Sequence, residues 1–273
     1  MSRTLDGYLD ERLGRGRGYL IKAEAMKTLG LSGTSFAAAA ARLTRQRRLA
    51  TPKQGFYLIL RPEERAAGGP DPARWIDPLM QHIGVDYRIS LLRAAAFHGA
   101  SHQAAQIFQV VVPKQLRPIA IDRQRIRFVY QAPDAFVAVN RSPWLEQLKT
   151  DAGFAKVAGV ELLLLDVVRY FRQAAGLNGA AQIIHDLGAN ADPRTLARAA
   201  TFYENSIARR LGYLLEHFSH TRQAASLRPL ALKAKSFKPL DPSVRVVASL
   251  ARVKAPDAPI WKLRLNVPLE IDA

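Results

Sequence analysis

The first 30 positions of the chain place their apolar residues at the spacing of amphipathic helices. The first predicted helix has four apolar residues on one side: Leu5, Tyr8, Leu9 and Leu13. The glycine-rich sequence RGRG at residues 15–18 should end it. A second helix is predicted for Lys22–Leu29. The chain is therefore expected to begin with two short helices that share one core.

A third helix is predicted for residues 33–46, and both of its ends carry recognisable signals. Gly30 suits the left-handed conformation that closes the preceding helix, and Ser32 is a good N-cap. The apolar stripe of this helix falls at i, i+3, i+4 and i+7, on Phe36, Ala39, Ala40 and Leu43. The opposite face carries short side chains at its start and cations at its end: Thr34, Ser35, Ala38, Arg42 and Arg45.

Two short strands follow, at residues 49–51 and 56–60, with Lys53-Gln54-Gly55 as the turn. Helix, tight turn, helix with a basic end and hairpin occur in the order of a winged helix-turn-helix, which inserts one helix into the DNA major groove. The alternative is a plain three-helix domain with a solvated basic face. The candidate DNA-binding residues are Thr34, Ser35, Arg42, Arg45, Arg47, Arg48, Lys53 and Gln54.

A boundary is predicted after this motif, because Gly68-Gly69 and Pro70-Asp71 are strong chain breakers. We expect a DNA-binding domain at residues 1–65, a linker at 66–72 and a larger mixed α/β domain at 73–273. The fold class is thus α+β or α/β, with an N-terminal winged helix-turn-helix.

The larger domain is predicted to mix helices and strands. Helices are expected at residues 72–82, 87–98, 160–174, 179–187, 193–204 and 206–217. The helix at 87–98 should bury Ile89, Leu92 and Ala96 and end at Gly99, and Asp192 before Pro193 should begin the helix at 193–204. Strands are expected at Ile107–Val112, Ile119–Ile121, 126–130, 136–139, 244–250 and 260–267.

The formal net charge of +17 changes the picture more than the rest of the composition does. A field of this sign favours polyanionic partners, with nucleic acid first and an acidic membrane surface or an acidic protein next. The absence of cysteine excludes disulfides, thiolate zinc sites and cysteine nucleophiles. We find no apolar run long enough to span a bilayer and no apolar signal core at the N-terminus, so a soluble, cytoplasmic protein is expected.

Signals of an enzyme are weak. His98 and His102 lie four residues apart, but Gly99 between them should end the helix, so we expect no metal site. Glu161 and Asp166 lie five apart on a predicted helix and face different directions. No phosphate-binding loop and no nucleophile elbow occurs. We therefore expect no catalytic residues, no cofactor and no enzymatic activity, with a nucleic-acid enzyme of unfamiliar active site as an alternative.

Two further segments resemble a known family. They are DYRISLLRAAAFHGASHQAAQIFQVVVPKQLRPIAIDRQRIRFVY at residues 86–130 and APIWKLRLNVPLEID at residues 258–272. A helix that ends in His-Gly, followed by a QVVVPK strand and an RIRF strand, resembles the AbiEi family of type IV antitoxins. The plan of a winged helix followed by a larger α/β domain is similar over nearly the whole length.

This resemblance implies two functions. The winged helix would bind inverted repeats in double-stranded promoter DNA and repress its own operon, and the second domain would counteract a nucleotidyltransferase-like toxin without a stable complex. The protein would be monomeric in solution, with several copies on DNA. A stand-alone regulator with a ligand-sensing second domain is the alternative. The candidate basic surface for the antitoxin role comprises Lys114, Arg117, Arg123, Arg125, Arg127, Arg209, Arg210, Lys233 and Lys235.

Overall fold

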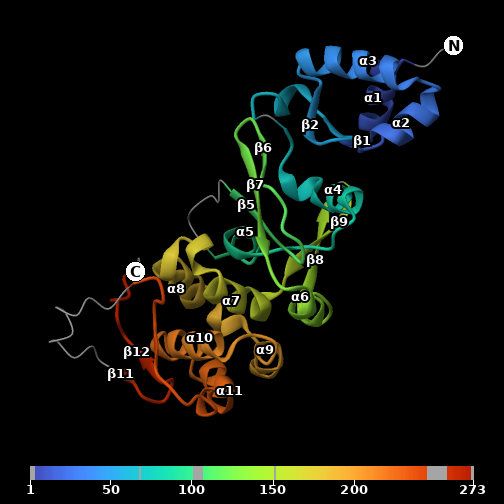
Figure 1. The fold of residues 1–273 in the computed structure, drawn as a ribbon. Helices are drawn as coiled ribbons and strands as arrows, with labels where there is room; N and C mark the ends of the chain where they lie inside the picture. The colour runs from blue at the N-terminus through green and yellow to red at the C-terminus, as the bar shows by residue number, and fades with distance from the viewer. Residues whose placement is uncertain (1–3, 68, 101–106, 151, 245–256, 272–273) are drawn as a thin grey trace. The chain divides into compact units, whose positions relative to one another are not determined.

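The computed structural model describes residues 4–67, 69–100, 107–150, 152–244 and 257–271 (Figure 1). The chain divides into two compact units. The N-terminal unit comprises residues 1–89, 106–131 and 147–156, and the C-terminal unit comprises residues 90–105, 132–146 and 157–273. The predicted division into residues 1–65 and 73–273 stays a prediction.

The first part of the N-terminal unit has the predicted element order, with one added strand. Its elements are α1 (Leu5–Gly14), β1 (Tyr19–Ile21), α2 (Lys22–Leu29), α3 (Gly33–Arg45), β2 (Leu49–Lys53) and β3 (Phe56–Ile59). The three helices and the hairpin are confirmed. The sequence did not predict β1, which pairs antiparallel with β3 to give the sheet order β1-β3-β2.

The helix ends follow the predicted chemistry. Gly30 takes the left-handed conformation after α2, with a φ of 64°. The Ser32 side chain accepts a hydrogen bond from the Ser35 backbone N–H over 3.1 Å, which satisfies one of the free donors at the start of α3. These two residues set the tight turn between α2 and α3.

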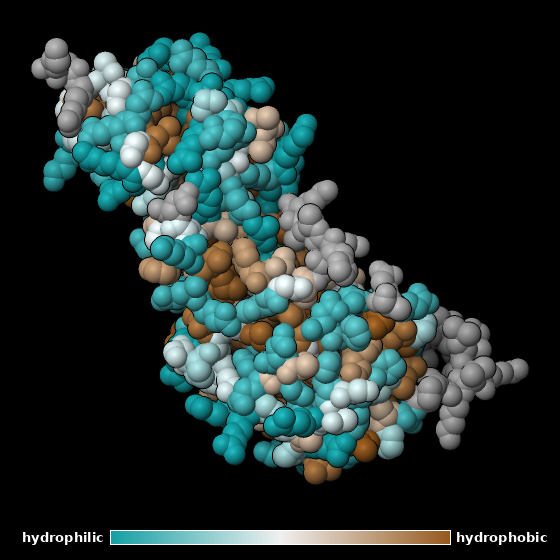
Figure 2. All heavy atoms as spheres, turned by 180° about the vertical axis from the view of Figure 1, so that it is seen from behind, coloured by the Kyte–Doolittle hydropathy of each residue, from teal (hydrophilic) through white to brown (hydrophobic). Residues whose placement is uncertain are grey.

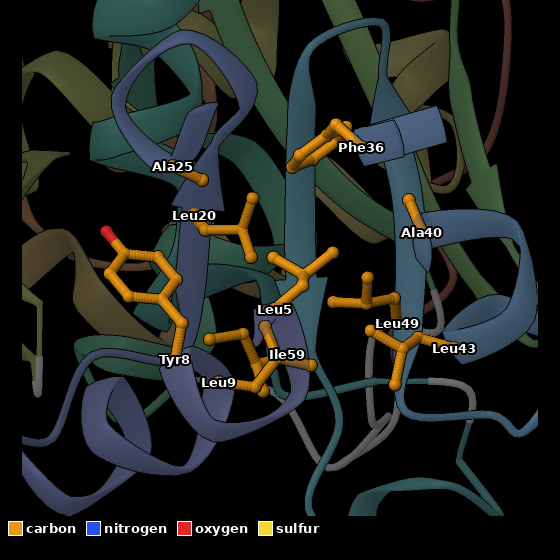
Figure 3. Packing of buried hydrophobic residues seen from close by; sticks show 10 residues of the cluster. All are labelled: Leu5, Tyr8, Leu9, Leu20, Ala25, Phe36, Ala40, Leu43, Leu49 and Ile59. Carbon is orange, nitrogen blue, oxygen red and sulfur yellow. The ribbon is translucent and has the colours of Figure 1, made fainter. Parts of the chain in front are cut away.

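Each of these six elements contributes to one apolar core, shown in Figure 3. From α3, Phe36 and Leu43 are fully buried and Ala40 is 4% exposed. Ala39, also predicted to lie on the apolar stripe, packs partly buried against the same cluster. The core contains Leu5, Tyr8, Leu9, Leu20, Ala25, Phe36, Ala40, Leu43, Leu49 and Ile59.

The rest of the N-terminal unit is built around a six-stranded sheet with the order β6-β7-β5-β4-β9-β8. Two 3₁₀ turns, η1 (Pro62–Glu64) and η2 (Pro72–Arg74), lead to α4 (Ile76–Ile83), so the predicted helix at 72–82 is interrupted at Trp75. The strands are β4 (Arg88–Ile89), β5 (Ile107–Val112), β6 (Ile119–Ile121), β7 (Gln124–Tyr130), β8 (Leu145–Thr150) and β9 (Gly153–Ala158). Strands β5 and β7 run parallel. The sequence analysis did not predict strands β8 and β9.

The predicted helix at 87–98 is wrong in its first third. Arg88 and Ile89 form β4 and pair with β5, and only Leu91–Phe97 forms a helix, α5. The φ of 57° at Leu91 turns the chain between the two elements. As a result the helix buries Leu91, Ala94 and Ala95, while the predicted core residue Ala96 is exposed.

The predicted strand at 136–139 is also wrong, because Pro133–Val139 forms the helix α6. Pro133 occupies its first turn, where the missing N–H costs nothing. Phe136 and Val139, three residues apart, are buried, whereas Val137 is 67% exposed. This spacing is helical, and the alternation required of a strand is absent.

The C-terminal unit is mostly helical. Besides α5 and α6 it contains α7 (Val160–Arg169), η3 (Phe171–Gln173), α8 (Gly176–Leu187), η4 (Gly188–Asn190), α9 (Pro193–Ala200), α10 (Asn205–His217) and α11 (Thr221–Leu232). The predicted N-cap Asp192 is confirmed, since its side chain accepts from the Thr195 N–H over 2.8 Å. Helix α11, which contains Pro229, was not predicted. A small sheet, ordered β10-β12-β11, joins β10 (Lys238–Pro239), β11 (Asp257–Ala258) and β12 (Leu263–Arg264).

The two strands predicted near the C-terminus compare differently with the structure. The strand expected at 260–267 is reduced to the two residues of β12. The strand expected at 244–250 falls, apart from Val244, outside the described residues.

Arg209 and Arg210 on α10 are structural and do not belong to the predicted basic surface. They are only 3% and 7% exposed. Arg209 donates hydrogen bonds to the backbone carbonyls of Trp261 over 2.8 Å and Ser236 over 3.0 Å, and also to that of Lys262. Arg210 donates to the Pro239 carbonyl over 3.1 Å. Burial lowers the pKa of both guanidinium groups.

Replacing Phe36 with alanine should loosen the N-terminal core, because a fully buried aromatic side chain is lost and a cavity remains. We expect the free energy of opening α1 to α3 to fall by about 3–5 kcal/mol, measured by hydrogen exchange of their backbone amides. The matched control is Ala41→Ser on the exposed side of the same helix, which should cost about 0.5 kcal/mol. Equal losses in the two variants would contradict this account of the core.

Replacing Arg209 with alanine should leave the carbonyls of Trp261 and Ser236 without their donor. We expect a loss of roughly 2–3 kcal/mol in the stability of the C-terminal unit, measured by hydrogen exchange in α10 and β12. The exposed Arg172 provides the control, since Arg172→Ala should change stability by less than about 0.5 kcal/mol. If the backbone amides of α10 and β12 exchanged as slowly in Arg209→Ala as in the wild type, the hydrogen bonds of Arg209 would not stabilise the C-terminal unit.

Candidate nucleic-acid interface

Helix α3 separates its apolar and polar residues onto opposite sides. With Phe36, Ala40 and Leu43 turned into the core, the predicted contact residues Thr34, Ser35, Arg42 and Arg45 are all exposed. On the face shown in Figure 2, the N-terminal region at the upper left presents mainly hydrophilic side chains. The helix therefore offers short hydroxyl side chains at its first turn and two guanidinium groups at its last.

The hydroxyl groups at the start of α3 form a small network around the N-cap. The Ser32 hydroxyl donates to the Ser35 hydroxyl over 2.9 Å and lies 3.1 Å from that of Thr34. Because side-chain rotation is restricted in this network, Thr34 and Ser35 are held in place before any ligand is bound. Such pre-ordering lowers the entropic cost of binding.

The two arginines that follow α3, Arg47 and Arg48, lie in different environments. Arg47 is exposed and takes a positive φ of 52°, which turns the chain out of the helix. Arg48 is half-buried and forms ion pairs with Asp6, over 2.6 Å, and with Asp10, both on α1. Two carboxylates neutralise the Arg48 charge, so its structural role is to hold α1 beside the end of α3.

The turn of the hairpin between β2 and β3 is held on two sides. Gly55, with a φ of 80°, accepts a hydrogen bond from the Lys22 N–H at the start of α2 over 2.8 Å. The Gln54 carbonyl lies 3.0 Å from Nε2 of His82 on α4. Lys53 and Gln54 are exposed, and Lys53 is the last residue of β2 rather than part of the turn. The predicted wing residues thus lie on an anchored hairpin.

A groove of about 730 Å³ lies between this turn and α2. Its lining is apolar at Ile21, Met26 and Leu31 and cationic at Lys22 and Lys27. The Lys22 ammonium also lies 5.9 Å from the centre of the Phe36 ring. The start of α2, the turn before α3 and the hairpin therefore surround one positively charged depression.

The remaining basic residues of the sequence analysis fall into two exposed groups. The N-terminal unit holds the first on the loop before β6 and on the β6–β7 hairpin: Lys114, Arg117, Arg123, Arg125 and Arg127. The second, Lys233 and Lys235, follows α11 in the C-terminal unit. Sequence reasoning could not separate these groups, because it contains no information on which strands share a unit.

Among the described residues no group of three histidine or acidic side chains is placed to hold a metal ion. His98 lies 2.8 Å from the Ala158 carbonyl, and His102 lies outside the described residues. The two acids of α7 serve the packing. Buried Asp166 accepts hydrogen bonds from Ser90 and Tyr203, and Glu161 accepts from the Asp192 N–H. Over the part of the chain that the structure describes, no helix is long and apolar enough to cross a membrane.

The fold is similar to that of a solved protein. The crystal structure of the RV2827C protein from Mycobacterium tuberculosis superposes with a TM-score of 0.64 over 94% of this chain and 89% of that one. The identity is 16%, so the likeness concerns the fold alone. It agrees with the predicted mixed α/β class. No curated protein shows significant sequence similarity to the chain.

One family model matches the sequence, and it identifies the second part of the chain. Residues 88–217 match the AbiEi antitoxin C-terminal domain. This range begins at β4 and ends with α10, and it contains the QVVVPK and RIRF strands on which the resemblance was based. Residues 88–217 therefore belong to the AbiEi antitoxin C-terminal domain family, so the chain carries the antitoxin domain of a toxin–antitoxin system.

Proposed function

We propose that the chain is a type IV antitoxin that also represses its own operon. Residues 1–65 act as a winged helix-turn-helix that binds inverted repeats in double-stranded promoter DNA. The C-terminal unit counteracts a nucleotidyltransferase-like toxin in the cytoplasm without forming a stable complex. The antitoxin role is supported by the match of residues 88–217 to the AbiEi antitoxin C-terminal domain. The DNA-binding role rests on one observation, the exposed polar face of α3.

That face carries side chains of the kinds that contact DNA in the major groove. A helix enters the groove with its N-terminal residues near the base edges, and cations along it reach the phosphates. Thr34 and Ser35 can donate and accept hydrogen bonds at base edges, and Arg42 and Arg45 lie two and three turns further along. Arg47, Lys53 and Gln54 extend the contact to the backbone on either side, whereas Arg48 acts through its ion pairs with α1.

Inverted repeats require two copies of the protein, because one helix reads one half-site. We expect a monomer in solution and several copies on DNA. The net charge of +17 opposes close association of free copies, and the DNA phosphates remove this repulsion.

The antitoxin surface that we propose comprises Lys233 and Lys235. Neither forms an ion pair within the described part of the chain. The segment between them is fixed, because the Lys262 ammonium donates to the Ala234 carbonyl. Two exposed ammonium groups on a fixed segment can bind an anionic group of the toxin's nucleotide or RNA substrate.

The double variant Arg42→Ala, Arg45→Ala should bind the DNA upstream of the gene more weakly. We expect at least a several-fold rise in Kd, and a fall of about 2 in the slope of log K against log salt if both side chains reach phosphates. Fluorescence anisotropy over a salt series measures both quantities. The matched control, Arg172→Gln with Arg222→Gln, removes two exposed charges from the C-terminal unit and should leave both unchanged. Unchanged binding in the α3 variant would remove this helix from the interface.

The two proposed activities should be lost separately in full-length variants. Substitutions are preferable to truncation at residue 72, because residues 106–131 and 147–156 share a unit with residues 1–89. In cells that express the neighbouring nucleotidyltransferase-type toxin, Lys233→Gln with Lys235→Gln should lose growth protection and keep promoter repression.

The α3 double variant should show the opposite result in the same assay, with protection retained and repression lost. Accumulation of each variant is measured by immunoblot so that loss of protein is not counted as loss of activity. Protection at the wild-type level in Lys233→Gln, Lys235→Gln would exclude this surface from the antitoxin mechanism.

A further inference from the structure

The groove between α2 and the β2–β3 turn is left without a role by the proposed function. Its volume of about 730 Å³ lies within the roughly 300–1,000 Å³ that is typical of sites for small ligands. The start of α2, the turn before α3 and the hairpin turn supply most of its lining, and every lining residue belongs to the N-terminal unit. A depression of this size fits a small molecule.

One wall of the groove is apolar. Met26 and Leu31 are half-buried, and they line the groove while packing against the N-terminal core. The Leu31 N–H donates to the Met26 carbonyl over 3.1 Å, which keeps the two residues adjacent. Ile21 and Ala23 extend this surface. A ligand with an apolar body would remove these side chains from water, and this is favourable.

The groove is also cationic, through Lys22 and Lys27. Neither ammonium group forms a hydrogen bond or an ion pair with the described residues. The acid between them in the sequence, Glu24, pairs with Arg12 over 3.0 Å, and no acidic side chain is among the described residues that line the groove. Two uncompensated positive charges beside an apolar wall suit a ligand with an anionic head and an apolar body.

Hydrogen bonds join the walls of the groove. The Lys22 N–H donates to the Gly55 carbonyl over 2.8 Å, so the start of α2 is attached to the hairpin turn. On the other side of this turn, Nε2 of His82 lies 3.0 Å from the Gln54 carbonyl. Strand β2 also lies against β6 within the same unit, which supports the hairpin. The site is therefore formed before a ligand binds.

We propose that this groove binds a small organic carboxylate with an apolar body. The carboxylate accepts hydrogen bonds from the ammonium groups of Lys22 and Lys27, and the apolar body covers Met26 and Leu31. The inference goes beyond the proposed function, because binding of this ligand requires neither DNA nor toxin. It adds a small-molecule site next to the candidate nucleic-acid interface.

Binding of a bare phosphate group, either free or in a nucleic acid, is the competing explanation for the two lysines. The apolar lining favours the carboxylate. A phosphate group is polar on all sides, and it would lose hydration against Met26 and Leu31 without a compensating contact. The test therefore includes inorganic phosphate.

The test uses the full-length protein with isotope-labelled methionine methyl groups, observed by NMR. Of its three methionines, Met26 lines the groove, and Met80 lies outside it and is 1% exposed. Octanoate should shift the Met26 signal with a Kd on the order of millimolar and leave the Met80 signal in place. Octanamide keeps the apolar body without the charge and should bind about tenfold more weakly. Acetate and inorganic phosphate should cause no shift at the same concentrations. An unshifted Met80 signal verifies the fold of each variant.

Two variants test the role of charge in the groove. In Lys22→Gln, Lys27→Gln the affinity for octanoate should fall about tenfold, to that of octanamide, whose own affinity should not change. Ala23→Glu adds an acid at an exposed position of the lining and should weaken octanoate binding by a similar factor. The control Arg172→Gln, Arg222→Gln removes the same charge from exposed positions elsewhere and should bind octanoate as the wild type does.

The absence of a Met26 shift with octanoate in the wild-type protein would overturn the inference. Equal affinities for octanoate and octanamide would make the groove a purely apolar site, and equal affinities for octanoate and phosphate would make it a phosphate site. Either result contradicts the proposal, as does wild-type octanoate affinity in Lys22→Gln, Lys27→Gln. None of these measurements involves DNA, so the proposal for α3 stands or falls separately.

Discussion

The burial of one side of α3 in the N-terminal core is the constraint on which the candidate nucleic-acid interface depends. Phe36 and Leu43 are fully buried, and this fixes the rotation of the helix about its axis. A helix rotated by half a turn would put Thr34 and Arg42 into an apolar cluster, and burying an unpaired guanidinium is far more costly than the loss of one packing contact. The exposed residues of α3 are therefore positioned by the residues of the same helix that are buried in the core.

The charge of the chain acquires a different meaning once the environment of each cation is known. Forty lysines and arginines against 23 acids suggest a diffuse positive surface. Yet Arg48 is held by two carboxylates, Arg209 by three backbone carbonyls, and Arg12 by Tyr8, Glu24 and the Tyr19 carbonyl. These arginines connect elements of the fold. Among the exposed cations, groups lie on α3, on the β6–β7 hairpin and after α11, while others such as Arg172 and Arg222 lie apart from these groups.

Local signals in the sequence predicted much of the N-terminal unit. The signals given by Gly30, Ser32 and the apolar stripe of α3 depend on residues that are close in the sequence. These features can therefore be predicted from the sequence alone. The elements that were wrong or missed are decided at longer range. Arg88 is in a strand because β5 lies beside it, and Arg209 is buried because residues about 50 positions later offer it carbonyl oxygens. The candidate residues on α3 could therefore be predicted, whereas the grouping of the other cations could not.

The contact between β2 and β6 has a consequence for the behaviour of the protein at high concentration. Each is the terminal strand of its own sheet and presents backbone donors and acceptors along one edge. Open edges of this kind recruit strands from other molecules and start aggregation. Here the terminal strand of one sheet lies against the terminal strand of the other within a single chain. The contact between β2 and β6 thus places beside each other, in one molecule, two strands that could otherwise pair with strands of other molecules.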